Sequence, residues 1–146
     1  RYDDSGLYTE LSGTIRAKKN EDLKNRVELI NSSNADLVIS IHLNSFPQKQ
    51  YSGAHVFYQK SNEISTKLAA DAIQESMKNI LDKNNSRVPQ IKKGIKIMDD
   101  TSLPVILIEC GFLSNNNEER KLISGDYQEK TAWAVYTGII TYFNEL

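Results

Sequence analysis

The sequence predicts an α/β domain in which an open, mostly parallel sheet is flanked by helices. Two runs, residues 37–43 and 105–108, are apolar on both faces. Such runs are typical of strands in a parallel sheet that helices cover on both sides. Segments with helical spacing of apolar residues alternate with these strands, which is the pattern of a layered α/β domain. The 146 residues suit one domain, 1–146, with a single core.

The first half of the chain is predicted to hold one helix and two strands. The helix begins at Asn20, because Asn is a favoured N-cap and acidic residues follow it. It ends at the polar cluster 31–34. Strands are predicted over 37–43 and 54–58, the second of which is rich in β-forming residues. Residues 1–18 have weaker periodicity, with Leu7, Leu11 and Ile15 four residues apart, which allows a short helix there.

The middle of the chain is predicted as a helix, a loop and two strands. Ser61 can cap a long helix whose apolar residues keep helical spacing as far as Ile80. A polar loop follows over 82–90. Short apolar runs at 95–98 and 105–108 then predict two strands, separated by a turn.

Two helices are predicted to close the chain. A short one covers 118–123, and Asp126 with Glu129 forms a start for the last one that resembles a capping box. The buried face of the last helix is predicted to carry Ala132, Tyr136, Ile139, Ile140 and Phe143.

Composition excludes several classes of protein. The formal net charge is -1, without the Lys/Arg surplus of the usual nucleic-acid binder. Cys110 is the single cysteine, so no disulfide forms within the chain. The longest mostly apolar stretch, 104–113, is about half a membrane span and contains Glu109, so no membrane span is expected. Because the sequence starts at Arg1, we expect a processed chain or one taken from a longer protein.

Two polar residues stand where the strand pattern calls for apolar ones. His42 and Glu109 each lie at the carboxyl end of a strand built for the interior. In open α/β sheets, sites form outside the carboxyl ends of the strands. A histidine beside a glutamate can supply a metal ligand and a general base, or an acid/base pair.

Plainer interpretations of these residues stay open at this stage. His42 can be a hydrogen-bonded core histidine, and Glu109 can hold the backbone N–H groups of the turn that follows it. His55 lies inside a strand, where half-buried structural roles dominate. Cys110 with His42 superficially supplies a cysteine-hydrolase set. Adjacent strand residues point to opposite faces, however, so Cys110 and Glu109 are not expected to share a crevice.

Three motifs, in this order, resemble a known family. They are Ser-Ile-His-Leu-Asn at 40–44, Gly-Ala-His-Val-Phe-Tyr at 53–58 and Ile-Glu-Cys-Gly-Phe-Leu-Ser-Asn at 108–115. Together they are similar to the zinc-dependent N-acetylmuramoyl-L-alanine amidases of the Amidase_3 type. Smaller details look most like the spore-cortex, germination-specific branch; they lie at 22–26, 46–47, 51–54, 108–110 and 127–128.

The resemblance implies an activity and a set of site residues. The activity is hydrolysis of the amide between N-acetylmuramic acid and L-alanine in peptidoglycan, by water that a zinc ion activates. His42 matches a zinc-binding histidine of the family, and Glu109 matches its catalytic glutamate. Asn44, Ser114 and Asn115 are candidates for orienting the substrate, although Ser114 and Asn115 also suit a cap on the turn after Glu109.

The chain also departs from the family pattern. The family has two further zinc ligands, one in a His-Gly-Gly-like motif after its first strand and a glutamate in its first helix, and neither has a match here. Glu10 and His55 are available but match no family ligand. We therefore expect an N-terminally truncated amidase domain that lacks the first strand-helix-strand, binds zinc poorly and hydrolyses little alone. Its exposed sheet edge and apolar face predict association with the missing segment, a second chain or a protein partner.

The expected setting is the spore cortex. An enzyme of this kind works outside the cytoplasm, in the space around the forespore or in the cell wall, with its export signal upstream of Arg1. The alternative is a non-catalytic module that keeps the amidase fold and binds the cell wall or a partner protein.

Overall fold

A four-stranded sheet forms the centre of the computed structural model, which describes residues 5–9 and 13–146. Its strands are β1 (Val38–Asn44), β2 (His55–Tyr58), β3 (Gln90–Ile91) and β4 (Val105–Phe112), in the order β1-β4-β2-β3. β1 is parallel to β4 and β3 is parallel to β2, whereas β2 is antiparallel to β4. The sheet is therefore mixed, with two of its three pairings parallel, as the α/β prediction expects.

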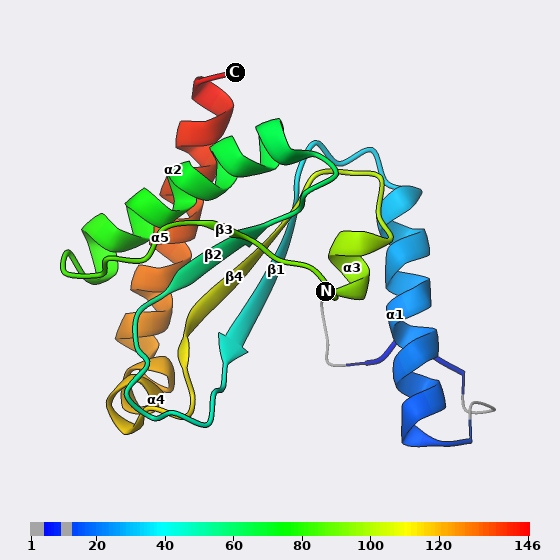
Figure 1. Ribbon diagram of the computed structural model, residues 1–146, viewed down its shortest axis with the longest axis horizontal. Coiled ribbons are helices and arrows are strands. Elements are labelled where there is room, and N and C mark those ends of the chain that lie inside the picture. Colours follow the sequence, from blue (N-terminus) through cyan, green and yellow to red (C-terminus); the bar gives the residue numbers. More distant parts are fainter. Residues whose placement is uncertain (1–4, 10–12) are drawn as a thin grey trace.

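Helices cover both faces of this sheet (Figure 1). α2 (Glu63–Leu81) and α5 (Gly125–Asn144) pack on one face and on each other. α3 (Lys96–Asp99) lies on the opposite face, beside α1 (Ile15–Asn31). α4 (Asn116–Leu122) follows β4 directly and packs against it.

Alternate side chains of β4 enter two separate apolar clusters. Ile106, Ile108 and Cys110 belong to the cluster under α2 and α5. Leu107 belongs to the smaller cluster beside α3. By the same alternation Glu109 points to the α3 face, so Cys110 and Glu109 lie on opposite faces as predicted.

Helix α1 begins earlier than the sequence predicted. Thr14 is its N-cap, and the Thr14 hydroxyl accepts a hydrogen bond from the backbone N–H of Ala17 at 3.1 Å. Asn20, the predicted cap, therefore lies inside the helix. Thr14 prevails because its extended backbone and its side-chain oxygen together satisfy a helix-start N–H group.

The segment before α1 is tied to the helix by polar contacts. The Asp22 carboxylate pairs with the Arg26 guanidinium at 2.7 Å and also accepts a hydrogen bond from the backbone N–H of Leu7 at 2.6 Å. Leu7 lies in a bend rather than in the short helix that periodicity allowed. Glu10 and Leu11 lie outside the described residues.

The strand predicted at 95–98 is wrong, because this run forms helix α3. The backbone N–H groups of Met98 and Asp99 both bond to the carbonyl of Ile95, at 2.8 and 2.9 Å. Gly94 has a φ of 78°, which turns the chain out of an extended path just before the helix. A short apolar run does not by itself distinguish a strand from a buried helical turn. The strand in this region is β3, which begins at the last residue of the predicted loop 82–90.

The predicted buried face of α5 is also wrong. The residues that are buried are Ala134, Val135, Gly138 and Tyr142. Gly138 sits so close to α2 that an added Cβ would lie 2.5 Å from the Cα of Ile73. Small residues on this face let α2 and α5 approach closely. The larger apolar side chains of α5 then face outward, and Tyr136, for example, is 53% exposed. Ala132, Ile140 and Phe143 are exposed as well, and Ile139 is only partly buried.

Strand β1 forms an edge of the described sheet, and an apolar surface lies next to it. Ile41 is 63% exposed and Leu43 is 47% exposed. Both line an apolar depression of about 480 Å3 that continues onto α5, where Tyr136 and Ile139 contribute. The predicted exposed edge and apolar face are thus present, whereas their origin in a truncated domain stays a prediction. Within the part of the chain that the structure describes, no helix is both long and apolar enough to cross a membrane.

Candidate functional site

Three titratable side chains lie next to one another across three adjacent strands, and we call this row the rung. His42 of β1 is the register partner of Glu109 of β4, and Glu109 is also the register partner of His55 of β2. Side chains of register partners project from the same face, about 5 Å apart at Cβ. Both residues that the sequence singled out at strand ends are therefore neighbours, and His55 joins them.

Glu109 is placed to work as an acid or base. Its side chain is half-buried, and its Oε2 is buried without a hydrogen-bond partner among the described residues. Burial raises the pKa of the Glu109 carboxyl, while the charges of His42 and Lys92 lower it and so act against the effect of burial. A buried carboxylate oxygen with no partner is costly, and in a protein it usually marks a group that acts on something else.

His42 is not a core histidine. Its side chain is exposed, at the open end of β1, where its Nε2 lies 2.9 Å from the hydroxyl oxygen of Ser40. Ser40 stands two residues earlier on the same strand and on the same face, so the hydroxyl orients the ring. This arrangement suits a ligand or a proton-transfer partner and removes the structural alternative that the sequence left open for His42.

His55 shares this rung and has the structural role that the sequence favoured for it. It is 5% exposed, and its Nε2 donates to the carbonyl of Val88 at 2.9 Å. Burial lowers the pKa of His55, the hydrogen bond to Val88 raises it, and the charges of Arg87 and Lys92 lower it further. A neutral ring that donates through Nε2 keeps Nδ1 as an acceptor. The sequence shows that His55 and Phe57 are two residues apart and so lie on the same face of their strand. Only the pairing of β2 with β4 shows that Glu109 lies on that face as well.

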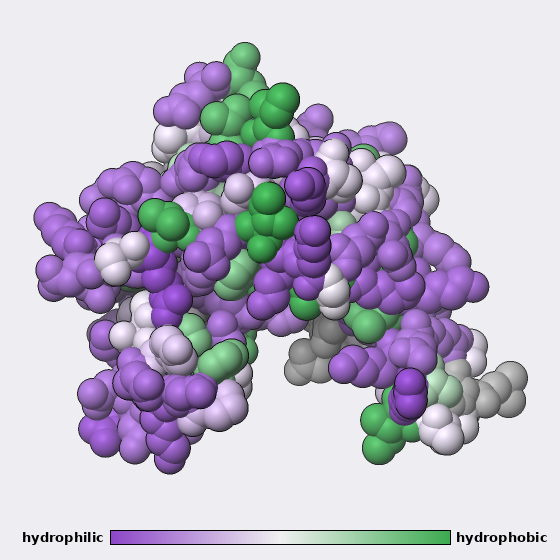
Figure 2. All heavy atoms as spheres, in the orientation of Figure 1, coloured by the Kyte–Doolittle hydropathy of each residue, from purple (hydrophilic) through white to green (hydrophobic). Residues whose placement is uncertain are grey.

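A pocket of about 300 Å3 opens beside this rung. Its lining combines aromatic side chains with polar and basic ones; the lining residues are Asn44, Phe46, Tyr51, His55, Phe57, Arg87, Gln90, Lys92 and Phe112. Aromatic side chains with a few converging polar groups are the usual lining of a small-molecule or substrate site. Figure 2 shows that the lower edge of the molecule in this view is notched between the lobe that contains α4 and the lobe that contains α1.

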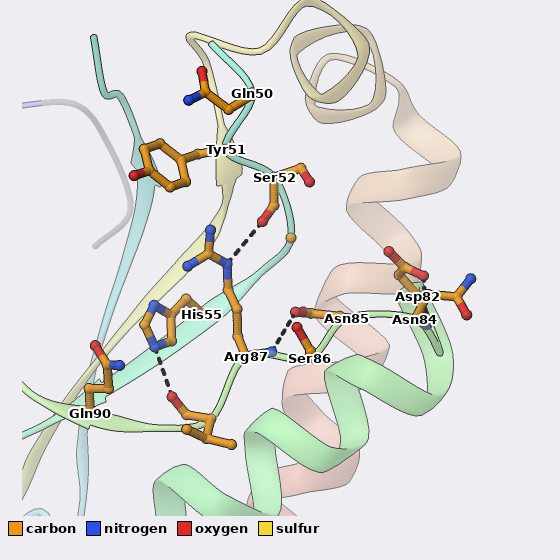
Figure 3. A pocket seen from close by; sticks show the side chains of 12 residues that line it. Gln50, Tyr51, Ser52, His55, Asp82, Asn84, Asn85, Ser86, Arg87 and Gln90 are labelled. Carbon is orange, nitrogen blue, oxygen red and sulfur yellow. Dashed lines mark hydrogen bonds between the residues drawn. The ribbon is translucent and has the colours of Figure 1, made fainter. Parts of the chain in front are cut away.

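A second pocket, of about 450 Å3, adjoins the first one. Figure 3 shows the side chains that line this second pocket. The two share Tyr51, His55, Arg87 and Gln90. The rest of the second lining is mostly amides and hydroxyls from two loops, Gln50–Gly53 and Asp82–Val88. In Figure 3 the Arg87 side chain rises between these loops, where its Nε donates to the carbonyl of Ser52 at 2.9 Å. The pair of pockets forms one trough along His55, the register partner of Glu109, although Glu109 itself lines neither pocket.

The structural role considered for Glu109 belongs instead to Glu118. The Glu118 carboxylate is 7% exposed. Its Oε1 accepts from the backbone N–H of Gly53 and its Oε2 accepts from the backbone N–H of Phe112, each at 3.0 Å. Glu118 therefore fastens the loop before β2 to the end of β4, and Glu109 is left free of that task.

The three predicted substrate-binding residues are placed differently. Asn44 lines the smaller pocket. The Ser114 hydroxyl accepts from the backbone N–H of Phe46 at 3.0 Å. Asn115 caps α4 by accepting from two backbone N–H groups, and its amide donates to the carbonyl of Tyr51 at 3.2 Å. The polar atoms of Ser114 and Asn115 thus hold the loop around the pocket, and a contact of any of the three with substrate stays a prediction.

Cys110 has no place in this trough. It belongs to the apolar cluster on the opposite face and is 4% exposed. Burial, reinforced by the charge of Glu109, raises the pKa of the Cys110 thiol to about 11. A neutral thiol on the wrong face does not supply a nucleophile, so a cysteine hydrolase is excluded.

The described residues do not by themselves fit a complete zinc centre. No cluster of three or more His, Cys, Asp or Glu side chains suited to a metal ion occurs within residues 5–9 and 13–146. A catalytic zinc ion normally takes three protein ligands and a water. His42 and the unpartnered Glu109 supply one ligand and one carboxylate, and a metal would need donors from outside the described part of the chain.

Comparison with known proteins places this arrangement in a family. The N-acetylmuramoyl-L-alanine amidase family model, Amidase_3, matches residues 6–141. The germination-specific N-acetylmuramoyl-L-alanine amidase of Bacillus subtilis (strain 168) is 40% identical over 145 residues, which cover 99% of this chain and 60% of that protein. The chain therefore spans less than two thirds of that relative's length.

Solved structures agree with the sequence comparison. The CwlD amidase of Clostridioides difficile, in complex with the GerS lipoprotein, superposes with a TM-score of 0.95 at 46% identity, over 100% of this chain and 74% of that one. An N-acetylmuramoyl-L-alanine amidase of Clostridium difficile 630 superposes with a TM-score of 0.73 at 29% identity, over 84% of this chain and 65% of that one. By its motifs, its fold and the match over nearly its whole length, the chain belongs to the N-acetylmuramoyl-L-alanine amidase family.

Proposed function

We propose that this chain carries the base, the substrate trough and one metal ligand of an amidase that cleaves the bond between N-acetylmuramic acid and L-alanine in peptidoglycan. The observation that supports it most is the Glu109 carboxylate. Its Oε2 is buried and unpartnered among the described residues, and Glu109 is the register partner of both His42 and His55. Burial raises the pKa of this carboxyl, which is the direction that suits general acid–base work.

In this proposal Glu109 moves one proton. Its carboxylate takes the proton of the attacking water as the new C–O bond forms at the carbonyl of the muramic acid. The resulting carboxylic acid returns that proton to the nitrogen of L-alanine as the C–N bond breaks. The products are a free muramic carboxyl group and a peptide with a free amino terminus, so atoms and charge balance.

Zinc is part of the proposal, with His42 as the ligand that this chain contributes. The remaining ligands would come from residues outside the described part. Elemental analysis of the chain purified without chelators tests this directly. About one zinc ion per chain supports a site completed by other donors. Zinc bound equally well by wild type and His42→Ala contradicts the assignment of His42.

The names of the relatives suggest the setting. The Bacillus subtilis relative is called germination-specific, and the Clostridioides difficile relative was solved with a lipoprotein. We propose that this protein likewise acts outside the cytoplasm, on spore-cortex peptidoglycan, and that it has a protein partner. The exposed face around Ile41 and Leu43 is where such a partner or a further segment of an amidase domain would find apolar surface.

A non-catalytic wall-binding or partner-binding module is the alternative. It is favoured by one observation, the lack of a three-ligand cluster in the described part of the chain. The experiment that separates the two compares Glu109→Gln with Glu119→Gln in the natural protein that contains this chain. Glu119 is an exposed residue of α4 and lines neither pocket of the trough.

The measurement is the release of free L-alanine amino groups from purified peptidoglycan in the presence of zinc. We expect Glu109→Gln to reduce release at least about 100-fold, the usual worth of a general acid–base group, and Glu119→Gln to leave it unchanged. Wild type without measurable release, while it still binds peptidoglycan, would support the module. Glu109→Gln with more than a tenth of wild-type activity would overturn the assignment of the base.

A further inference from the structure

Two cationic side chains enter the smaller pocket beside Glu109. The Arg87 guanidinium lies over the ring of Phe112, with Cζ 4.9 Å from the ring centroid. The Lys92 ammonium lies over the ring of Phe57, with Nζ 4.6 Å from the centroid. Cation–π contacts of this kind fix the direction of a charged group without neutralising its charge.

Neither cation is neutralised by an acid of the described chain. Neither Arg87 nor Lys92 forms an ion pair with a carboxylate among residues 5–9 and 13–146. In the same part of the chain the hydrogen bonds of the guanidinium use Nε alone, which donates to the carbonyl of Ser52, so its two terminal nitrogens stay available. Among the described residues, the lining of this pocket contains no Asp or Glu.

The charges of Arg87 and Lys92 affect the same neighbouring side chains. Both lower the pKa of His55, and Lys92 also lowers the pKa of Glu109. His55 is fixed by its hydrogen bond to Val88. The neutral ring of His55 carries no negative charge that would balance the two cations. The result is a positively charged pocket next to the proposed base, with aromatic rings beneath the two charges.

We propose that Arg87 and Lys92 bind a carboxylate of the peptide, and that they thereby decide which side of the scissile amide enters this pocket. The inference rests on the proposed function. In that amide the carboxyl group of muramic acid is consumed in the bond itself, so the adjoining sugar is uncharged. The free carboxylates of an intact substrate lie on the peptide side. A guanidinium fork with an ammonium group beside it is a strong receptor for a carboxylate.

This assignment gives the trough a direction. The peptide occupies the smaller pocket, which Lys92 lines, and Arg87 lies where the two pockets meet because it lines both. The glycan lies along the amide- and hydroxyl-rich pocket between the loops Gln50–Gly53 and Asp82–Val88. Peptides whose carboxylates are amidated are then poorer ligands, because they offer the two cations no charge.

The test measures binding and does not need hydrolysis. N-acetyl-L-alanyl-D-glutamate and its diamide are titrated into the chain at low ionic strength, and dissociation constants are taken from NMR shifts. A charge-assisted contact predicts that the free acid binds at least about tenfold more tightly than the diamide. Lys92→Gln should reduce this ratio threefold or more. Lys93→Gln, which removes the neighbouring exposed lysine, should preserve it.

Arg87 is tested separately because it also bonds to the loop at Ser52. Arg87→Lys keeps the charge but loses the fork, and Arg87→Gln loses both. A ratio that falls in the order wild type, Arg87→Lys, Arg87→Gln supports the proposal, with circular dichroism showing that each variant is folded.

Three results would overturn it: equal binding of acid and diamide by wild type, an equal loss in Lys93→Gln, or shifts confined to residues outside the pocket. The two proposals fail independently. Discrimination without hydrolysis by the natural protein refutes the enzyme assignment alone, and hydrolysis without discrimination refutes the carboxylate site alone.

Discussion

Replacing Glu118 by Gln tests whether the site is held together by one buried carboxylate. In the wild type both carboxylate oxygens accept a backbone N–H, one from Gly53 and one from Phe112, each at 3.0 Å. An amide has only one oxygen. Its NH2 group must face the other N–H, so one buried donor loses its acceptor and meets a second donor.

The magnitude follows from these contacts. The change removes one hydrogen bond to a charged acceptor and leaves a buried backbone N–H unsatisfied, which costs about 3 kcal/mol. For a chain of this length 1 kcal/mol shifts the melting temperature by about 3 °C, so we expect Glu118→Gln to melt about 10 °C lower. The amides of Gly53 and Phe112 should also exchange with solvent about 100-fold faster, because 3 kcal/mol is about two factors of ten.

Thermal unfolding followed by circular dichroism and amide exchange followed by NMR make the two measurements. Glu119→Gln is the matched control. The Glu119 side chain is exposed on the same helix, and a surface change of this kind alters stability by less than about 0.5 kcal/mol. A Glu118→Gln variant that melts within about 2 °C of wild type, with unchanged exchange at both amides, would refute the argument that this carboxylate fastens the loop to β4.

Three further predictions concern the rest of the molecule. Gly138→Val should destabilise the chain by about 2 kcal/mol, because a Cβ there lies 2.5 Å from a backbone atom of α2. Gly125→Ala should leave the stability unchanged, because an added Cβ there meets nothing within 4 Å. Equal melting temperatures of the two variants would contradict the close contact between the helices. The thiol pKa of Cys110 is raised to about 11 in the fold, so folding favours the protonated form: iodoacetamide should label the folded chain slowly at pH 8, and the free energy of unfolding should fall as pH rises from about 9 to about 11. Rapid labelling without denaturant would contradict the burial. Ile41→Lys should reduce concentration-dependent self-association, measured by sedimentation, more than Ile15→Lys does. Ile41 lies on the apolar face at the sheet edge, whereas Ile15 is 88% exposed at the start of α1 and does not line that face. Equal effects of the two substitutions would show that the apolar face does not drive association.

The sequence alone determined three of the four strands and the two polar residues at the ends of β1 and β4. Runs that are apolar on both faces predicted β1 and β4, and β-forming residues predicted β2, each within a residue or a few of its limits. His42 and Glu109 stood out because a polar residue in such a run has to be explained by function or by a partner. The separation of Cys110 from Glu109 also followed from strand alternation alone.

Other features depended on contacts between distant segments. Helix α3 replaced the predicted strand at 95–98 because Gly94 turns the chain and Met98 finds a place in the core, which four apolar residues do not encode. The buried face of α5 depended on Gly138 and its fit against α2, because the helix has apolar residues on more than one side.

The site itself was completed only by strand order. Since β4 lies between β1 and β2, Glu109 has a histidine on either side, and His55 joins a rung that no spacing along the chain reveals. The same order brings Arg87 and Lys92 to the pocket beside that rung. Glu118, and not Glu109, accepts the backbone N–H groups of Gly53 and Phe112 that fasten the loop before β2 to the end of β4. Local pattern therefore named the groups that carry chemistry, whereas tertiary pairing decided their neighbours, because neighbours across a sheet are set by the order of strands and not by distance in sequence.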